Sequence, residues 1–157
     1  MHREEGFGDG APDIVRRVGD ALVRSSGDAV IAADRDGKIL LWNPGAVRIF
    51  GYSEQDAMGR SLDIIVPERL RDPHWQGYAR VMSGGESRYG SGDVLAVPAV
   101  RSDGSRISIE FTIVPLPDRS GTLMGLIAVV RDVTKRFEEM RALKLALAER
   151  KPSAPGP

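Results

Sequence analysis

The spacing of apolar residues divides the first part of the chain into a helix and two strands. An amphipathic helix is predicted over residues 13–25, where apolar side chains recur every four residues between charged positions: Ile14, Val18 and Leu22. Two apolar runs follow at residues 29–33 and 38–42, and Asp36 and Gly37 between them are typical of a tight turn. We therefore expect a β-hairpin directly after the first helix.

The middle of the chain is expected to be helical. Asn43 has a side chain that can cap a helix and Pro44 suits the first helical position, so short helices are predicted from there to about Val66. A longer helix is predicted over residues 67–83, with Asp72 as its cap. The two glycines that follow this segment indicate its end.

Three strands are expected in the second half of the chain, at residues 94–100, 107–113 and 123–130. The middle strand alternates strictly between apolar and polar residues, and its apolar face is formed by Ile107, Ile109, Phe111 and Ile113. The order of helix, two strands, short helices, three strands and helix indicates an α+β fold, with an antiparallel sheet covered by helices on one face.

The last predicted helix covers residues 134–150, with Thr134 as its cap. Its apolar residues form a narrow stripe: Val133, Phe137, Met140, Leu143 and Leu147. Such a stripe suits a two-helix seam, although packing against the chain's own sheet stays open. The partner helix is expected to be the one at residues 13–25, in the same chain or across a homodimer.

The ends of the chain lack periodicity. Residues 1–12 are expected to be a flexible leader and residues 151–157, with three prolines, a disordered tail. The domain between the two flanking helices is expected at residues 26–133.

Composition narrows the classes of function. The 157 residues include 22 Lys and Arg against 22 Asp and Glu, so the formal net charge is zero and direct binding to nucleic acid or a membrane is not expected. Cysteine is absent, which excludes disulfides, thiolate metal sites and cysteine adducts. No secretory leader or membrane-spanning run is evident, so we expect a cytoplasmic protein.

Several motifs together resemble those of PAS domains. The matching segments are DAVIAADRDGKILLWN at 28–43, FGYS at 50–53, GRSL at 59–62, RSDG at 101–104 and GLIAVVRDVT at 125–134. The resemblance covers about residues 25–134. It implies a five-stranded antiparallel sheet, a ligand cavity between the sheet and the helices, and flanking helices that pass on a signal.

The resemblance also suggests a ligand. In bacterial gas sensors with haem-binding PAS domains, the helix that corresponds to residues 67–83 carries the axial histidine. The chain has two histidines, His2 in the leader and His74 in this helix. The resemblance therefore implies a b-type haem with His74 as its iron ligand, in a sensor of CO, NO, O2 or redox state.

Further residues of the expected haem site come from the same comparison. Arg80 and Arg88 lie six and fourteen residues after His74, where related sensors hold the haem propionates. Tyr78 belongs to the same helix, and the resemblance places Phe111 and Ile113 on the gas side.

The position of a gas-binding arginine in related sensors is taken here by Val94 or Leu95. Neither side chain can donate a hydrogen bond to bound oxygen. The sequence therefore predicts weak or rapidly oxidising oxygen complexes, whereas CO and NO depend less on such a bond.

Two alternatives to the haem sensor stay open. One is a cofactor-free PAS domain that serves dimerisation or interaction with a signalling protein. The other is a non-covalent flavin stacked on Trp42 or Trp75. No catalytic arrangement is evident around the single internal histidine, so an enzyme is not expected.

Overall fold

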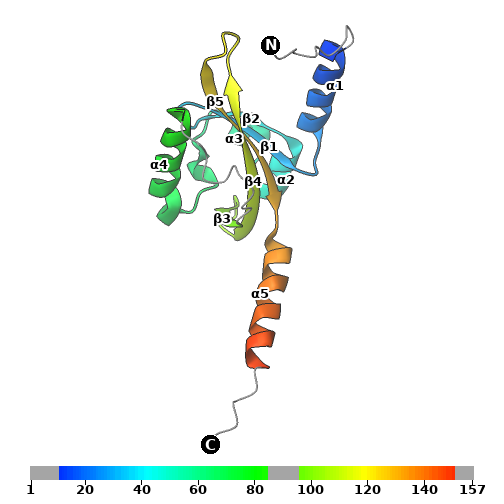
Figure 1. Cartoon of the computed structure of the whole chain (residues 1–157), viewed down its shortest axis with the longest axis vertical. Helices are drawn as coiled ribbons and strands as arrows, with labels where there is room; N and C mark the ends of the chain where they lie inside the picture. The colour runs from blue at the N-terminus through cyan, green and yellow to red at the C-terminus, as the bar shows by residue number, and fades with distance from the viewer. Residues whose placement is uncertain (1–10, 85–95, 151–157) are drawn as a thin grey trace, which may run out of the picture.

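The computed structural model describes residues 11–84 and 96–150 (Figure 1). The centre of this part of the chain is an antiparallel sheet of five strands in the order β2-β1-β5-β4-β3. The strands are β1 (Ala29–Asp34), β2 (Ile39–Trp42), β3 (Val97–Val100), β4 (Arg106–Pro117) and β5 (Leu123–Asp132). The helices are α1 (Ala11–Arg24), α2 (Pro44–Phe50), α3 (Glu54–Ala57), η1 (Leu62–Ile64), η2 (Glu68–Leu70), α4 (Arg71–Met82) and α5 (Thr134–Glu149). The predicted α+β fold with a five-stranded antiparallel sheet is confirmed.

Asn43 joins the predicted hairpin to helix α2. Its side-chain oxygen accepts hydrogen bonds from the backbone N–H groups of Val30 at 2.8 Å and Ala46 at 2.9 Å. Its side-chain amide donates to the carbonyls of Ser25 and Asp28, each at 3.0 Å. Asn43 itself is only 3% exposed, and its bond to Ala46 is buried, whereas the other three bonds are partly buried. One side chain therefore fixes the start of α2, the strand β1 and the loop before it.

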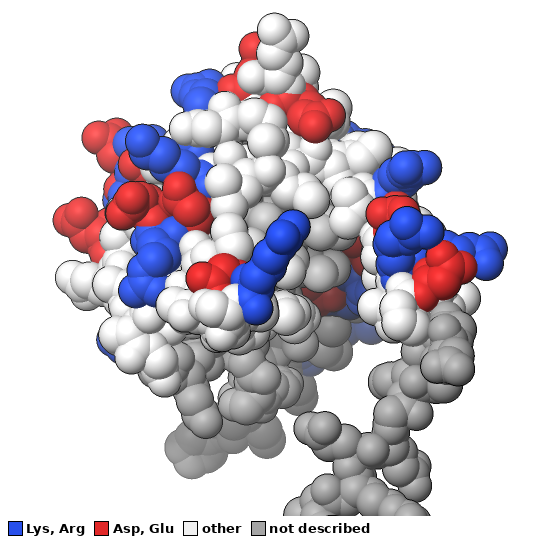
Figure 2. Space-filling view, turned by 90° about the horizontal axis from the view of Figure 1, so that it is seen from above, with Lys and Arg blue, Asp and Glu red and all other residues white. Residues whose placement is uncertain are grey.

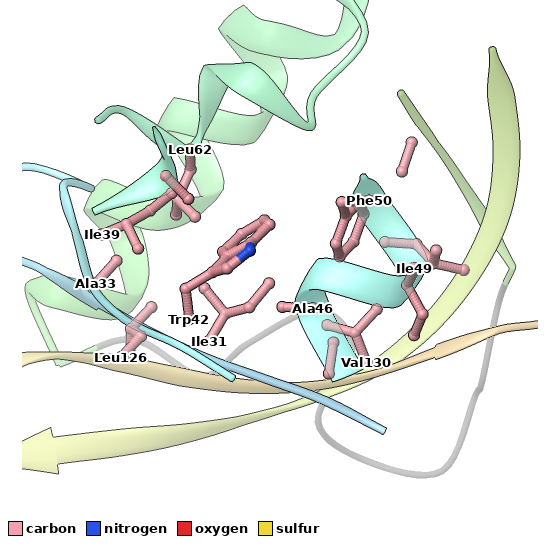
Figure 3. Close-up of a cluster of buried hydrophobic side chains, with 14 of the residues drawn as sticks. Ile31, Ala33, Ile39, Trp42, Ala46, Ile49, Phe50, Leu62, Leu126 and Val130 are labelled. Carbon is pink, nitrogen blue, oxygen red and sulfur yellow. The ribbon is translucent and has the colours of Figure 1, made fainter. Parts of the chain in front are cut away.

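Trp42 lies in the middle of the core, between the sheet and α2 (Figure 3). The centroids of its ring and that of Phe50 are 5.5 Å apart, and its indole N–H donates to the carbonyl of Tyr52 at 3.1 Å. Phe50, Ile39 and Ile49 are the largest side chains that are fully buried. The core thus forms where β1 and β2 meet α2, as the apolar runs of these segments require.

The alternation predicted for residues 107–113 is present in β4. Ile107 and Ile109 are buried, and Phe111 and Ile113 pack half-buried against the core. The strand runs on to Pro117, beyond the predicted end at residue 113, and includes a proline at position 115. Beyond Ile109, β4 has β5 on one side and no longer pairs with β3, so a residue without an N–H group is tolerated at this edge.

The opposite face of the sheet is also apolar. Val30, Ile127 and Val129 are half-buried there, and Val114 is 44% exposed. These residues alternate with the core-facing ones along their strands, so they point away from α2. No helix of the described residues covers this face.

Two helices begin differently from the prediction. The prediction of Asp72 as a cap is wrong, because η2 leads directly into α4 and the N–H of Arg71 donates to the carbonyl of Glu68. With Asp72 as the cap the helix would begin at residue 73. Helix α4 begins at Arg71 instead, two residues earlier and without a side-chain cap.

The prediction of Thr134 as the cap of α5 is also wrong. Val133 occupies the cap position, and it makes no side-chain cap. The hydroxyl of Thr134 accepts from the N–H of Ser108 at 3.0 Å and donates to Asp132 Oδ1 at 2.5 Å. The Thr134 hydroxyl thus bonds to β4 and is not available to cap α5.

The terminal helices α1 and α5 lie at opposite ends of the described chain (Figure 1). They do not pair within one chain, and α5 does not fold back onto the sheet. Nine of their large apolar residues are at least 47% exposed: Ile14, Val15, Val18, Leu22, Phe137, Met140, Leu143, Leu145 and Leu147. Val133 differs from the rest of its predicted stripe, because it is buried at the root of α5. The leader up to residue 10 and the tail at 151–157 lie outside the described residues.

Acidic and basic side chains are interspersed around an uncharged centre on the face shown in Figure 2. This face has no extended patch of one charge. None of the helices in the described ranges is long and apolar enough to cross a membrane.

Candidate functional site

Helix α4 is attached to the hairpin and to η1 by two aromatic side chains. The hydroxyl of Tyr78 donates to the carbonyl of Asp34 at the end of β1. The indole N–H of Trp75 donates to Asp63 Oδ1 at 2.8 Å. Burial, together with the charges of Asp34 and Asp36, raises the pKa of Tyr78 to about 12. Tyr78 therefore stays a neutral hydrogen-bond donor, and α4 is held in place on two sides.

His74 lies beside both of these aromatic side chains. Its ring centroid is 4.7 Å from that of Trp75 and 6.1 Å from that of Tyr78. Burial lowers the pKa of His74, and the opposing effect of the Asp63 carboxylate is smaller. The imidazole is therefore neutral at pH 7, with one nitrogen that donates and one that accepts.

The Nδ1 atom of His74 is buried and makes no hydrogen bond with any described residue. Buried polar atoms are nearly always paired, and an unpaired one costs about 1–3 kcal/mol. His74 Nδ1 is therefore a candidate for bonding to a ligand.

The other residues of the expected haem site are spread more widely. Arg80 is exposed on α4, whereas Phe111 and Ile113 lie on the core-facing side of β4. The structure brings His74 and Tyr78 together on one helix. The remaining expected site residues, Arg88, Val94 and Leu95, lie outside the described residues.

Two hollows stand out on the surface of the described residues, and His74 lines neither. One, of about 510 Å³, lies between residues 60–71 and the turn at 101–104. The other, of about 450 Å³, lies at the root of α5 and is lined by Glu110, Arg131 and Arg136 among others. The side chains of Trp75 and Tyr78 occupy the space beside the imidazole instead.

The root of α5 is tied to the sheet by several bonds. The N–H of Val133 donates to the carbonyl of Ser108 at 2.9 Å, and Arg136 pairs with Glu110 at 2.5 Å. On β5, Arg131 forms an ion pair with Asp28 at 3.2 Å. A shift of β4 against β5 would therefore change the direction of α5.

A family model described as PAS fold matches residues 23–138. The chain belongs to the PAS family. This PAS domain is similar to the PAS domain of a protein from Colwellia psychrerythraea, with a TM-score of 0.64 and 25% identity. That match covers 78% of this chain and 99% of the solved one.

Two curated relatives extend this comparison. A protein of Azorhizobium caulinodans described as uncharacterized is 35% identical over 125 residues, which cover 79% of this chain and 17% of the relative. The oxygen sensor protein DosP of Escherichia coli K12 is 26% identical over 117 residues, which cover 73% of this chain and 14% of DosP. The PAS domain thus spans less than a fifth of the curated relatives it matches.

The hollow between residues 60–71 and the turn at 101–104 is not predicted by the sequence patterns above. Arg60 and Arg101, which line it, belong to two of the PAS-like motifs, GRSL and RSDG. The recurrence of an arginine in both motifs was a signal that could have pointed to a shared site.

Proposed function

We propose that this PAS domain is a sensor that binds haem b through His74 and responds to CO, NO, O2 or redox state. The observation that carries the proposal is the buried His74 Nδ1 without a hydrogen-bond partner among the described residues. A histidine must be neutral to bind iron, and burial lowers the pKa of His74 accordingly. The likeness to an oxygen sensor protein supports the same assignment.

The donor chemistry of the chain fits haem. His74 would hold the iron, and Arg80 lies exposed on the same helix, where a propionate could be paired. Phe111 and Ile113 supply an apolar sheet face. When bound, haem supplies reversible gas binding or a one-electron change. Because Trp75 and Tyr78 both lie beside the imidazole, haem binding would require these side chains to move.

The chain's own residues offer a route for the signal. Tyr78 connects α4 to β1, which pairs with β5, and β5 leads into α5. The bonds of Ser108 and Glu110 hold the root of α5 against β4. A displacement of α4 would thus be transmitted through the sheet to α5. We propose that α1 and α5 contact a second copy of the chain or a signalling protein, and that the domain has no catalytic activity of its own.

A cofactor-free association module is the second candidate, and the filled space around His74 favours it. Trp75 and Tyr78 both make hydrogen bonds that hold α4 against the rest of the domain without any ligand. A flavin is less favoured. Trp42, one of the two indoles on which it could stack, is 2% exposed and packs against Phe50 and Tyr52.

An absorption spectrum of the protein separates the candidates, recorded as purified and again after addition of haem and removal of the unbound haem. The haem proposal predicts a Soret band at about 400–430 nm that is lost in His74→Ala and kept in the control His2→Ala. A band at about 450 nm in protein as purified indicates flavin instead. If the spectrum is featureless, or if His74→Ala leaves the Soret band unchanged, the haem proposal is wrong.

A further inference from the structure

The hollow of about 510 Å³ has walls that are held by backbone bonds. The N–H of Val100 on β3 donates to the carbonyl of Ile65 at 3.0 Å, and the N–H of Ser102 donates to the carbonyl of Phe50 at 2.8 Å. Gly51 lies against Ser102 so closely that a Cβ atom there would overlap the Ser102 hydroxyl. The shape of the hollow thus depends on main-chain contacts and is present without a ligand.

Three guanidinium groups and two carboxylates belong to residues that line this hollow. Arg71 and Asp63 form a pair of their own, with 3.9 Å between Arg71 Nε and Asp63 Oδ1. Arg71 also donates to the carbonyls of Val66 and Asp63, so its position is fixed by several contacts. This arginine is therefore already partnered within the chain.

The other two arginines are not paired with an acid. Arg60 lies over the ring of Tyr52, with 5.6 Å from its Cζ atom to the ring centroid. Arg60 is exposed and Arg101 is half-buried. Neither guanidinium forms an ion pair with any described residue, although the Asp103 carboxylate in the same turn attracts Arg101 electrostatically. Glu68 is the one remaining carboxylate in the lining, so the hollow carries an excess of one positive charge. Both guanidinium groups therefore keep N–H donors that no direct ion pair occupies.

We propose that this hollow binds a small organic anion, a carboxylate or a phosphate monoester attached to an apolar body. Arginine favours such oxyanions because its planar fork can donate two parallel hydrogen bonds. Tyr52, Ile64 and Val100 provide apolar surface for the body of the ligand. The volume falls within the range of about 300–1,000 Å³ that is usual for small-molecule sites.

The site is separate from the proposed haem site, because His74 does not line the hollow. Titration of isotope-labelled protein tests it by NMR, with the backbone amides of Val100, Ser102 and Gly104 as reporters. The probes are benzoate, phenyl phosphate and the neutral benzamide. Saturable shifts with benzoate indicate a carboxylate ligand, and shifts with phenyl phosphate indicate a phosphate monoester. The proposal is wrong if benzamide binds as tightly as the anions, or if neither anion shifts these amides at millimolar concentration.

Variants connect the binding to the two unpaired arginines. Arg101→Gln and Arg60→Gln are each expected to weaken binding about tenfold, which corresponds to the loss of one charge-assisted hydrogen bond. Arg106→Gln is the control, because Arg106 is exposed on β4 close to the same turn and does not line the hollow. Circular dichroism checks that each variant is folded. The proposal is overturned if Arg60→Gln and Arg101→Gln are folded and bind the anion as tightly as the original protein. It is also overturned if Arg106→Gln loses as much affinity as they do.

Discussion

The indole of Trp75 lies directly over Gly37, so closely that a Cβ atom at this glycine would overlap the ring. Gly37 also has φ +75°, in the left-handed region that other residues adopt at a cost. The glycine of the hairpin turn therefore serves two purposes. It allows the turn to form, and it leaves room for α4 to rest on the hairpin.

Replacing Gly37 by alanine tests this contact. We expect Gly37→Ala to lower the free energy of unfolding by about 3 kcal/mol, because backbone strain and overlap with Trp75 add up. Gly104→Ala is the matched control, since Gly104 has φ +82° and no atom within 4 Å of an added Cβ. Gly104→Ala is expected to lower the free energy of unfolding by about 1 kcal/mol. Urea unfolding measures the stability of both variants. If Gly37→Ala and Gly104→Ala lower the free energy of unfolding equally, the Trp75 side chain moves aside at no cost.

Two helical glycines should respond to the same substitution with opposite signs. In α2, a Cβ at Gly45 would overlap the backbone carbonyl of Asp28, so Gly45→Ala is expected to destabilise the protein by about 2–3 kcal/mol. In α4, Gly77 has open space around it, and Gly77→Ala is expected to stabilise by up to about 1 kcal/mol. Thermal unfolding of the two variants checks the signs. If Gly77→Ala is destabilised, a Cβ atom at this position does not have the open space expected on α4.

Asn43→Ala should be among the most damaging single substitutions. It removes four hydrogen bonds and leaves the buried backbone groups of Val30 and Asp28 without their partner. We expect a loss of about 3 kcal/mol in the free energy of unfolding. Ser53→Ala is the control, because Ser53 caps α3 through one hydrogen bond at an exposed site, and it should cost about 1 kcal/mol. Similar losses in the two variants would contradict the role assigned to Asn43.

The stability of the haem-free protein should fall on mild acidification because of His74. Burial lowers the pKa of His74 in the folded state below its ordinary value of 6.5. As the pH falls through this value, the unfolded chain binds a proton that the folded chain binds less readily. The stability present above about pH 6.5 is thus lost progressively below it, with a slope of at most about 1.4 kcal/mol per pH unit.

Urea unfolding at pH 7.5 and pH 5.5 measures this effect. His74→Gln should reduce the difference between the two conditions, whereas the control His2→Gln should keep it. The assignment fails if His74→Gln loses as much stability on acidification as the original protein.

The exposed terminal helices predict a homodimer. A helix of 16 residues is marginal in water without a partner, and Met140 and Leu147 on α5 are 53% and 66% exposed. Met140→Glu combined with Leu147→Glu should convert the dimer to a monomer in sedimentation experiments. Lys135→Glu changes the net charge by the same amount at the exposed start of α5, and it should leave the dimer intact. A monomeric original protein, or a dimer that survives the double substitution, would remove α5 from the interface.

Much of the fold follows from signals that lie close together in the sequence. The Asp-Gly turn predicted the hairpin, Asn43 and Pro44 predicted the start of α2, and the alternation from Ile107 to Ile113 predicted the buried face of β4. Each signal works because its cause is local: a turn geometry, a cap, or the two-residue period of a strand. The helix predicted over residues 67–83 contains α4, on which His74 lies.

Other features depend on residues that are far apart in the chain, and no local pattern contains them. The surroundings of His74 depend on the bond from Tyr78 to Asp34, which lies 44 residues away. Arg60 and Arg101 line one hollow because Val100 pairs with Ile65. Thr134 has the side chain of a helix cap, yet its hydroxyl accepts from Ser108 on the adjacent strand. The sequence thus specifies which groups are available, whereas packing of the sheet against α2 and α4 determines their partners, because hydrogen bonds and burial are set by distance in space.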